Sequence, residues 1–409
     1  FKNTPDRTVL LKTIESRIKG SYVPARHRPI LYGQAVPPET KRIEIQYLKN
    51  LDRIQTHTSV LSEDTAFKNI FLVETMKGCP HGCRFCTAGF ALRPPRLYPG
   101  QGVCQIMDKA LGKTDKIGLV SSAILDHPDI SHICRYGKEK GFTLSFSSLR
   151  ADRLGEDIID ILADSGVKTA TIAPEAGSER MRRIINKKIT KQQILDAAQR
   201  LVEKKILNLR LYFMMGLPFE MDEDVEAIVD LAGDIKSVFL EASRKNKKIG
   251  TITLSVNPFI PKPWTPFQWS GMTPEKTLKR RVEILRKGVK NLANVTLHME
   301  SLKKSRINGL LSLGDQKTAD ILESALELGW TRAMKTNQAY CHTVIHGEKP
   351  VMPENSRPNG PLLPWDFLRH HVSRNFLARE FRRAKKEKQS ASCPMKACGK
   401  CGICNVPGT

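Results

Sequence analysis

Seven of the ten cysteines in this chain of 409 residues fall into two short groups. Their spacings are C-x3-C-x2-C, carried by Cys79, Cys83 and Cys86, and C-x4-C-x2-C-x2-C, carried by Cys393, Cys398, Cys401 and Cys404. Disulfide frameworks are typical of short secreted domains, whereas clustered cysteines in a reducing cytosol are typical of metal ligands. We therefore predict a cytoplasmic protein with two metal centres. We expect the three scattered cysteines to be buried as small hydrophobic residues.

The first group can hold a cluster that keeps an open coordination position. Three thiolates on one loop bind three irons of a [4Fe–4S] cubane and leave the fourth iron without a protein ligand. Activation of a substrate at a metal needs such an open position. The alternative is a zinc site completed by His81, but this residue lies between two of the cysteines, where it would strain tetrahedral geometry. The spacing therefore favours iron–sulfur chemistry.

The second group offers four thiolates within residues 393–404, which would make a closed site. A zinc ribbon separates its two cysteine pairs by roughly 12–20 residues, and this segment does not. Its compact C-x2-C-x2-C run resembles ferredoxin loops and favours an iron–sulfur cluster over zinc. Zinc, disulfides and disorder stay open as alternatives. A closed cluster would transfer electrons or hold the tail together, and it would not activate a substrate.

The elements that could position the first group surround it and follow it along the chain. Short β-rich runs predict strands over residues 70–75, 117–122, 143–148, 169–173, 208–214 and 251–256. Amphipathic stretches between them predict helices such as residues 158–165, 193–204 and 222–235. Six β–α alternations imply a parallel sheet with right-handed crossovers. Because a complete barrel needs eight, we predict an α/β fold with an open partial (β/α)6 barrel and an active site at the carboxyl ends of its strands.

In this context the cysteine loop resembles a known family, the radical S-adenosylmethionine (SAM) enzymes. The loop follows the first expected strand and has the aromatic Phe85 immediately before its third cysteine, as the signature of that family does. The resemblance covers about residues 71–269. It implies that Cys79, Cys83 and Cys86 bind a [4Fe–4S] cluster and that SAM chelates the open iron. Reduction by a flavodoxin- or ferredoxin-type protein would cleave SAM to a 5′-deoxyadenosyl radical, which abstracts hydrogen from an unidentified substrate.

The resemblance also suggests cofactor contacts at the ends of the expected strands. Ser121 stands where the family has a Gly-rich motif that meets the methionine amine, and Ser147 stands where ribose contacts are usual. Glu175 could take the ribose hydroxyls. Lys187 occupies the position of an arginine that contacts the cofactor carboxylate in the methylthiotransferase branch, and it keeps the charge without the bidentate fork. Gly216 lies in a turn like the one on the adenine side. For the last three residues a purely structural role stays open.

Several segments resemble the branch of the family that has a cobalamin-binding domain at the amino terminus. They include residues 20–24, 83–95, 174–187, 257–269 and the second cysteine group. Nothing before residue 20 could form such a domain, so cobalamin is not assigned to residues of this chain. Because the chain begins with Phe1, we expect either a lost cobalamin domain or a divergent member without one. With cobalamin, the implied reaction is radical methylation or another C–C or C–S transformation.

The charge of the chain leaves two further alternatives open. Lysine and arginine exceed aspartate and glutamate by 24, and they concentrate after residue 274. Such a surface can attract RNA through its phosphates, although aromatic residues make up only 6% and no stacking platform is visible. The alternatives are an RNA-modifying enzyme like the methylthiotransferases, or a non-catalytic iron–sulfur or zinc protein that binds nucleic acid. No stretch is apolar enough to predict a membrane span.

The expected organisation has four parts. Residues 1–66 form a linker or extension, with an extended connection over residues 20–38 and one helix over residues 41–54. Residues 67–270 form the radical SAM core. Residues 271–390 form a basic and mostly helical region, with a loop over residues 337–364 and a last helix over residues 367–388. Residues 391–409 form the cysteine-rich, metal-binding tail.

Overall fold

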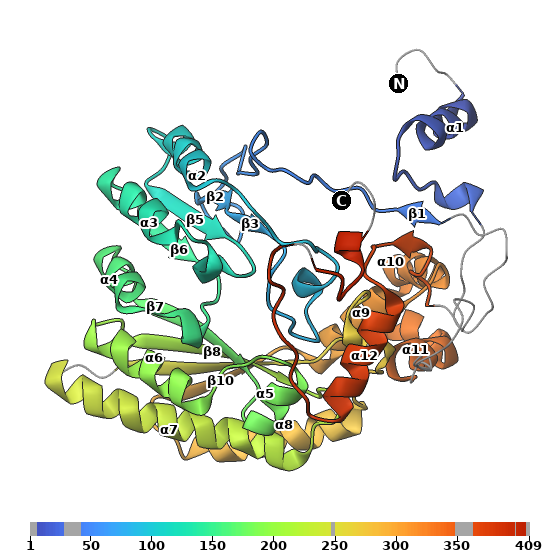
Figure 1. Cartoon of the computed structure of the whole chain (residues 1–409). Coiled ribbons are helices and arrows are strands. Elements are labelled where there is room, and N and C mark those ends of the chain that lie inside the picture. The colour runs from blue at the N-terminus through green and yellow to red at the C-terminus, as the bar shows by residue number, and fades with distance from the viewer. Residues whose placement is uncertain (1–5, 28–41, 247–249, 348–362, 397, 406–409) are drawn as a thin grey trace.

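Seven strands of two parallel sheets frame the protein in the computed structural model, which describes residues 6–27, 42–246, 250–347, 363–396 and 398–405. The first sheet has the order β2-β5-β6: β2 (Phe71–Glu74), β5 (Lys116–Val120) and β6 (Thr143–Phe146). The second has the order β7-β8-β9-β10: β7 (Thr169–Glu175), β8 (Asn208–Met215), β9 (Thr251–Pro258) and β10 (Val295–Met299). A parallel bridge between Leu149 and Ile172 joins the sheets. The strands form an open, partial α/β barrel (Figure 1), which confirms the predicted fold class.

A long helix connects each strand of the barrel to the next along the outside of the sheets (Figure 1), and the short α5 (Glu179–Ile184) precedes α6 between β7 and β8. The connecting helices are α2 (Gly100–Met107), α3 (Ile130–Glu139), α4 (Glu156–Asp164), α6 (Lys191–Glu203), α7 (Asp222–Asn246) and α8 (Glu275–Lys290). At the start of α6, Thr190 and Gln193 form a capping box, and the apolar stripe of Ile194, Ala197 and Leu201 turns into the core. Burial of each such Leu, Ile or Val contributes about 1.5–3 kcal/mol.

The barrel extends beyond the six expected strands. After β9, α8 brings the chain back so that β10 pairs in parallel with β9. On α8, Leu278, Val282 and Leu285 are buried, and all basic residues except Arg281 are exposed. One apolar face and one charged face are typical of a helix that lies on a sheet, although the basic charge of α8 predicts a region separate from the barrel. The basic segment over α8 therefore supplies the crossover from β9 to β10.

A second, smaller apolar core lies beneath the carboxyl-terminal helices. These helices are α9 (Leu302–Leu313), α10 (Lys317–Thr336), α11 (Gln338–His346) and α12 (Arg374–Lys385). The core includes Trp264 and Trp269 from the segment after β9, and Phe90 from the loop that carries the first cysteine group. The carboxyl-terminal helices therefore pack against the same end of the barrel as that loop.

Three expected elements differ from the structure. The predicted helix over residues 41–54 is wrong for residues 42–54, because β1 (Ile43–Glu44) runs extended and pairs with β11 (Leu368–Arg369). The same pairing shortens the helix expected from residue 367, since α12 begins only after Ser373, whose side chain accepts a hydrogen bond from the Phe376 amide. The loop expected over residues 337–364 contains α11, whose Cys341, Val344 and Ile345 reach the second core at helical spacing.

Residue 41 and residues 28–38 and 348–362 of these expectations lie outside the described residues. Ahead of the first gap, α1 (Arg7–Arg17) is capped by Asp6 and buries no side chain. The short 3-10 helices are η1 (Pro24–Arg26), η2 (Thr87–Gly89), η3 (Asp108–Ala110), η4 (Ile124–Asp126), η5 (Ala151–Arg153), η6 (Pro266–Trp269) and η7 (Ile403–Asn405).

The contact between the second core and the cysteine loop should be sensitive to pH through His370. Its ring lies 4.7 Å from the Trp264 ring, and its Nδ1 lies 3.2 Å from the Ala91 carbonyl, to which it donates. Burial lowers the pKa of His370 from 6.5 to about 4. As pH falls, His370 takes up a proton near pH 6.5 in the unfolded chain but only near pH 4 in the folded chain. Protonation therefore favours unfolding, and the contribution of neutral His370 to stability, which is fully present above pH 6.5, is lost as pH falls towards 4.

We therefore expect His370→Gln to flatten the loss of unfolding free energy between pH 6.5 and 4. The measurement is urea unfolding at several pH values, with His132→Gln as the control because His132 is exposed. A variant with the same slope as the wild type would contradict this assignment.

Candidate active site

The first cysteine group lies on a loop whose two ends are paired. β3 (Met76–Lys77) precedes the loop and β4 (Arg96–Leu97) follows it, and the two strands pair antiparallel. Gly78 enters the loop with φ of +78°, and a Cβ built there would lie 2.5 Å from the Leu92 carbonyl oxygen. Both observations require a glycine at this position. The loop is thus a closed turn of chain that starts just beyond β2.

Gly78→Ala should destabilise the protein more than Gly112→Ala. Both glycines have a left-handed backbone, with φ of +78° and +72°, so each substitution should cost about 1–2 kcal/mol in strain. Only Gly78 adds a collision, because a Cβ on Gly112 would meet nothing within 4 Å. The measurement is the free energy of unfolding in urea, and equal losses in the two variants would contradict the steric argument.

The three thiols of the loop lie close together and away from solvent. Cys79 and Cys83 are buried, and Cys86 is half-buried. Burial and then the neighbouring charges of Cys83 and Cys86 raise the pKa of Cys79 to about 12. Burial, and then Cys83, also raises the pKa of Cys86. Because metal binding requires thiolates, a bound group would have to displace these protons.

This donor set fits an iron–sulfur cluster. Three neighbouring thiols on one buried loop match a cluster held through three of its irons. Among the described residues, no three His, Cys, Asp or Glu side chains are arranged to hold a metal ion. His81, the other candidate ligand, is engaged elsewhere, since its Nε2 lies 2.8 Å from Oδ2 of Asp126.

Backbone contacts hold the cysteine loop against the chain that follows β7. The Arg84 amide donates to the Ile185 carbonyl over 3.0 Å, and Nδ2 of Asn186 donates to the Gly82 carbonyl over 2.9 Å. Both partners follow α5 (Glu179–Ile184), and Asn186 is buried with φ of +57°. Asparagine adopts this left-handed conformation more readily than most residues. The loop is therefore positioned by the barrel as well as by its own hairpin.

Four of the five expected cofactor-contact residues lie in two pairs near the ends of the strands. After β5 and β6, Oγ of Ser147 donates to the Ser121 carbonyl over 2.9 Å. At the end of β7, Oε1 of Glu175 lies 3.1 Å from Nζ of Lys187. Arg150 joins the two regions, because it follows β6 and its Nη2 donates to the Lys187 carbonyl over 3.1 Å.

Electrostatic interactions place this group beside the cysteine loop. The charge of Glu175 contributes to the raised pKa of Cys86. Burial lowers the pKa of Arg150, but its partner Asp152 and the charge of Cys83 leave it above the ordinary value. The cysteine loop therefore lies near the Glu175 carboxylate at the end of β7 and the Arg150 guanidinium after β6, and the Lys187 amine pairs with Glu175. Such a set can bind a zwitterionic ligand with a carboxylate and an amine.

Gly216, the fifth expected residue, forms its hydrogen bond with a different part of the protein. Its φ is +83°, and its amide donates to Oε2 of Glu220 over 2.6 Å. The same oxygen lies 2.6 Å from Nη1 of Arg281, and burial raises the pKa of Glu220 to about 7. Among the described residues, no hydrogen bond or ion pair links Gly216 to the cysteine loop. Its predicted role at the adenine therefore stays a prediction.

Sequence reasoning missed the partners of two polar residues near the loop. His127 is next to Asp126 in the sequence, but its Nε2 donates to the Tyr98 carbonyl over 2.8 Å and its Nδ1 accepts from the Asp129 amide. Asp126 pairs with His81 instead. Burial pushes the pKa of Asp126 up, but His81 and nearby arginines outweigh it and leave that pKa below its usual value. Asp126 and His81 are 45 residues apart, so local spacing could not reveal the pair.

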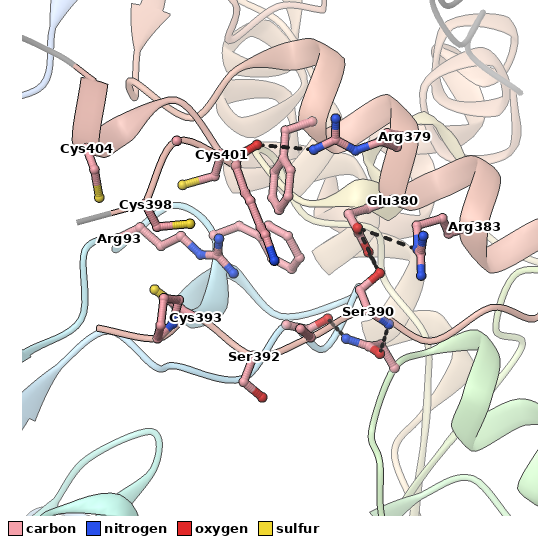
Figure 2. A pocket seen from close by; sticks show the side chains of 18 residues that line it. Arg93, Arg379, Glu380, Arg383, Ser390, Ser392, Cys393, Cys398, Cys401 and Cys404 are labelled. Carbon is pink, nitrogen blue, oxygen red and sulfur yellow. Dashed lines mark hydrogen bonds and ion pairs between the residues drawn. The ribbon is translucent and has the colours of Figure 1, made fainter. Parts of the chain in front are cut away.

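The second cysteine group lies directly against the first loop. The Cys393 amide donates to the Pro80 carbonyl over 2.8 Å, and the Ser390 amide donates to Oδ1 of Asn186 over 2.9 Å. Cys393, Cys398, Cys401 and Cys404 line a cavity of about 570 Å³ together with Arg93 and Arg379 (Figure 2). The structure thus brings together two cysteine groups that are far apart in the sequence.

A buried loop with three cysteines thus lies at the carboxyl ends of the strands of an open parallel barrel. Residues 73–232 match the family described as the Radical SAM superfamily. The chain therefore contains a radical SAM domain over these residues. A radical SAM domain implies a [4Fe–4S] cluster and SAM as cofactors.

Parts of the chain are also similar to curated proteins. An uncharacterized protein of Methanocaldococcus jannaschii is 33% identical over 264 residues, which are 64% of this chain and 56% of the relative. An uncharacterized methyltransferase of Pyrococcus horikoshii is 28% identical over 39% of this chain and 36% of its own length. A ribosomal protein uS12 methylthiotransferase of Thermodesulfovibrio yellowstonii is 24% identical over 53% of each chain. The chain thus spans about half the length of the curated relatives it matches, or less.

Among solved structures, one similar chain is the radical SAM methyltransferase TsrM of Kitasatospora setae, determined with cobalamin and a [4Fe–4S] cluster bound. The alignment has 14% sequence identity and a TM-score of 0.40, and it covers 66% of this chain and 60% of that one. Within the described residues, no helix is long and apolar enough to cross a membrane.

Proposed function

We propose that this protein cleaves SAM reductively and uses the 5′-deoxyadenosyl radical to modify a substrate. The observation that carries the proposal is the buried loop of Cys79, Cys83 and Cys86 facing the charged groups at the ends of β6 and β7. When bound, a [4Fe–4S] cluster supplies the single electron that splits the sulfur–C5′ bond of SAM into methionine and the radical. The protein holds the cofactors, orients them and keeps water away from them.

The residues of the chain suit the parts of SAM in a definite way. Lys187 is 6% exposed and would attract the methionine carboxylate, while Glu175 beside it would take the ribose hydroxyls. Ser121 and Ser147 offer hydroxyls at the ends of β5 and β6 for the methionine amine and the ribose. Gly216 would form the backbone wall at the adenine. Each assignment is a proposal that follows the family resemblance.

For the reaction class we propose transfer of a methyl group or a related carbon or sulfur unit, in the cytoplasm. The names of two relatives, a methyltransferase and a methylthiotransferase, support this class. We further propose cobalamin as an additional cofactor, because several segments resemble the cobalamin-binding branch. Its participation is tested by measuring whether methylated product depends on added cobalamin.

An RNA substrate is the second candidate, favoured by the basic face of α8. Lys279, Arg280 and Arg286 on this helix are all exposed. If RNA binds there, affinity should fall steeply between 50 and 200 mM salt, and replacing these residues by glutamine should reduce that dependence. The measurement is a filter-binding titration with a structured RNA. Salt-independent binding, or none, would count against this candidate.

The proposed function is tested by one anaerobic assay. The protein is loaded with iron and sulfide, reduced with dithionite and mixed with SAM, and 5′-deoxyadenosine is measured by chromatography. We expect product in proportion to the cluster content of the first site. Fully loaded protein that yields none would overturn the proposal in favour of a non-catalytic scaffold.

A further inference from the structure

The cavity lined by the four tail cysteines has a strongly cationic wall. Arg93, Arg379, Arg383 and Lys400 line it, and Glu380 is the carboxylate among its described lining residues. Oε2 of Glu380 is already committed, because it lies 3.2 Å from Nη2 of the buried Arg84. The wall therefore suits an anionic occupant. A metal–sulfur group held by four thiolates is anionic.

Arg93 is the cation that most needs such an occupant. Its side chain comes from the loop after the first cysteine group, and the residue is 8% exposed. Nε donates to the Gly89 carbonyl over 2.5 Å, and the guanidinium lies over the rings of Phe90 and Phe376 at 5.1 and 5.4 Å. No carboxylate among the described residues pairs with it. Burial of an uncompensated charge is costly, so the missing counter-charge should come from the cavity.

The side chain of Arg93 points towards the cavity that would hold this counter-charge. Figure 2 shows its guanidinium reaching between Cys398 and Cys393, with the sulfurs of Cys401 and Cys404 on the same side of the cavity. The space is large compared with a four-sulfur zinc site, in which each sulfur lies about 2.3 Å from the ion. A multi-iron cluster therefore suits the cavity better than one zinc ion.

The ligands of the two sites are one hydrogen bond apart. The Cys393 amide donates to the carbonyl of Pro80, which directly follows Cys79. Nη2 of Arg93 lies 3.9 Å from the place where a Cβ on Gly82 would be, so the guanidinium lies between the two cysteine groups. A redox group at the tail would have a short covalent and hydrogen-bonded path to the first site.

We propose that Cys393, Cys398, Cys401 and Cys404 hold an iron–sulfur cluster that passes single electrons to the site of Cys79, Cys83 and Cys86, and that Arg93 stabilises its reduced form. In each transfer the tail cluster is oxidised by one electron and the first cluster is reduced by one. A flavodoxin- or ferredoxin-type protein restores the tail cluster. The proposal rests on the proposed function, which supplies the acceptor.

The first test isolates the tail cluster in the full chain. A variant with Cys79, Cys83 and Cys86 all replaced by alanine is loaded anaerobically with iron and sulfide. We expect about four irons per chain and an electron paramagnetic resonance signal after reduction. Zinc in place of iron, or no reducible centre, would overturn the proposal even if the wild type makes 5′-deoxyadenosine.

Within that background the role of Arg93 is measured as a potential. Arg93→Gln removes a positive charge, so the reduction equilibrium should shift at least tenfold towards the oxidised form, which is about 59 mV for one electron. Arg93→Lys keeps the charge and should restore most of the potential. Arg332→Gln is the control, because Arg332 is exposed and lies outside the cavity. Equal potentials in all variants would remove Arg93 from the proposal.

The second test asks whether electrons pass between the sites. We compare 5′-deoxyadenosine formation driven by reduced flavodoxin with formation driven by dithionite, a small reductant that can reach the first site directly. Cys401→Ala should lower the flavodoxin-to-dithionite ratio at least tenfold. Cys341→Ala, at a buried cysteine outside both groups, is the matched control. An unchanged ratio in Cys401→Ala would overturn the relay.

The two proposals fail separately. A reducible tail cluster in the triple variant, with no product from the fully loaded wild type, would refute SAM cleavage and leave the tail cluster standing. Product from a wild type whose tail holds zinc would support SAM cleavage and refute the relay.

Discussion

Cys83→Ala should abolish 5′-deoxyadenosine formation. The residue lies between the other two cysteines of the loop, and its charge is the largest neighbouring contribution to the raised pKa values of both Cys79 and Cys86. With two thiols left, the first site cannot bind a cluster through three irons. We expect product below detection in the dithionite assay and a loss of about four irons per chain relative to the wild type.

The control for this prediction is Cys134→Ala, at a buried cysteine in the main core that belongs to neither group. It should keep the iron content and the product of the wild type. If Cys83→Ala retained product at the level of this control, the first cysteine group would not be the site of SAM cleavage.

Arg84→Ala should cause the largest loss of stability among single substitutions outside the apolar cores. The Arg84 side chain is fully buried, and it forms an ion pair with Glu380, whose side chain is 6% exposed. It also donates to the carbonyls of Ile184 over 2.7 Å and Lys388 over 2.6 Å. Removing one partner leaves a buried charge and unpaired carbonyls, which should cost about 3–5 kcal/mol.

The measurement is the free energy of unfolding in urea, with Arg286→Ala as the control. Arg286 also forms an ion pair, with Glu283, but both side chains are more than half exposed. Such surface pairs contribute about 0–1 kcal/mol. Comparable losses in the two variants would show that the Arg84 contact does not hold the loop to the tail.

The fold was predictable because its signals are local. Each barrel strand expected from the sequence appears within a few residues of its predicted bounds, since β-rich runs and intervening helices leave a periodic pattern. The seventh strand was missed because β10 is short and follows a helix whose charge masked its buried face. The helix expected near residue 50 is wrong because the amides of Ile43 and Ile45 donate to carbonyls more than 300 residues away.

The site was predictable in its residue types and not in its partners. Cysteine spacing pointed to the loop, and strand ends pointed to Ser121, Ser147 and Glu175. The pairing of Lys187 with Glu175 and of His81 with Asp126 depends on how separate strand ends meet. The contact between the tail and the cysteine loop could not be predicted from local sequence patterns, because residues 80 and 393 become neighbours only in the folded chain.

The distance between Arg84 and Glu380 along the chain also affects how the protein is made. The two residues are 296 positions apart. At about 5–20 residues per second, synthesis leaves the cysteine loop uncovered for roughly 15–60 s before its carboxyl-terminal partner emerges. The thiols are therefore open to cluster delivery, and to oxidation, during translation. Completion of the last helix and tail then closes over the loop, so the order of synthesis sets the time at which the first site can be filled most easily.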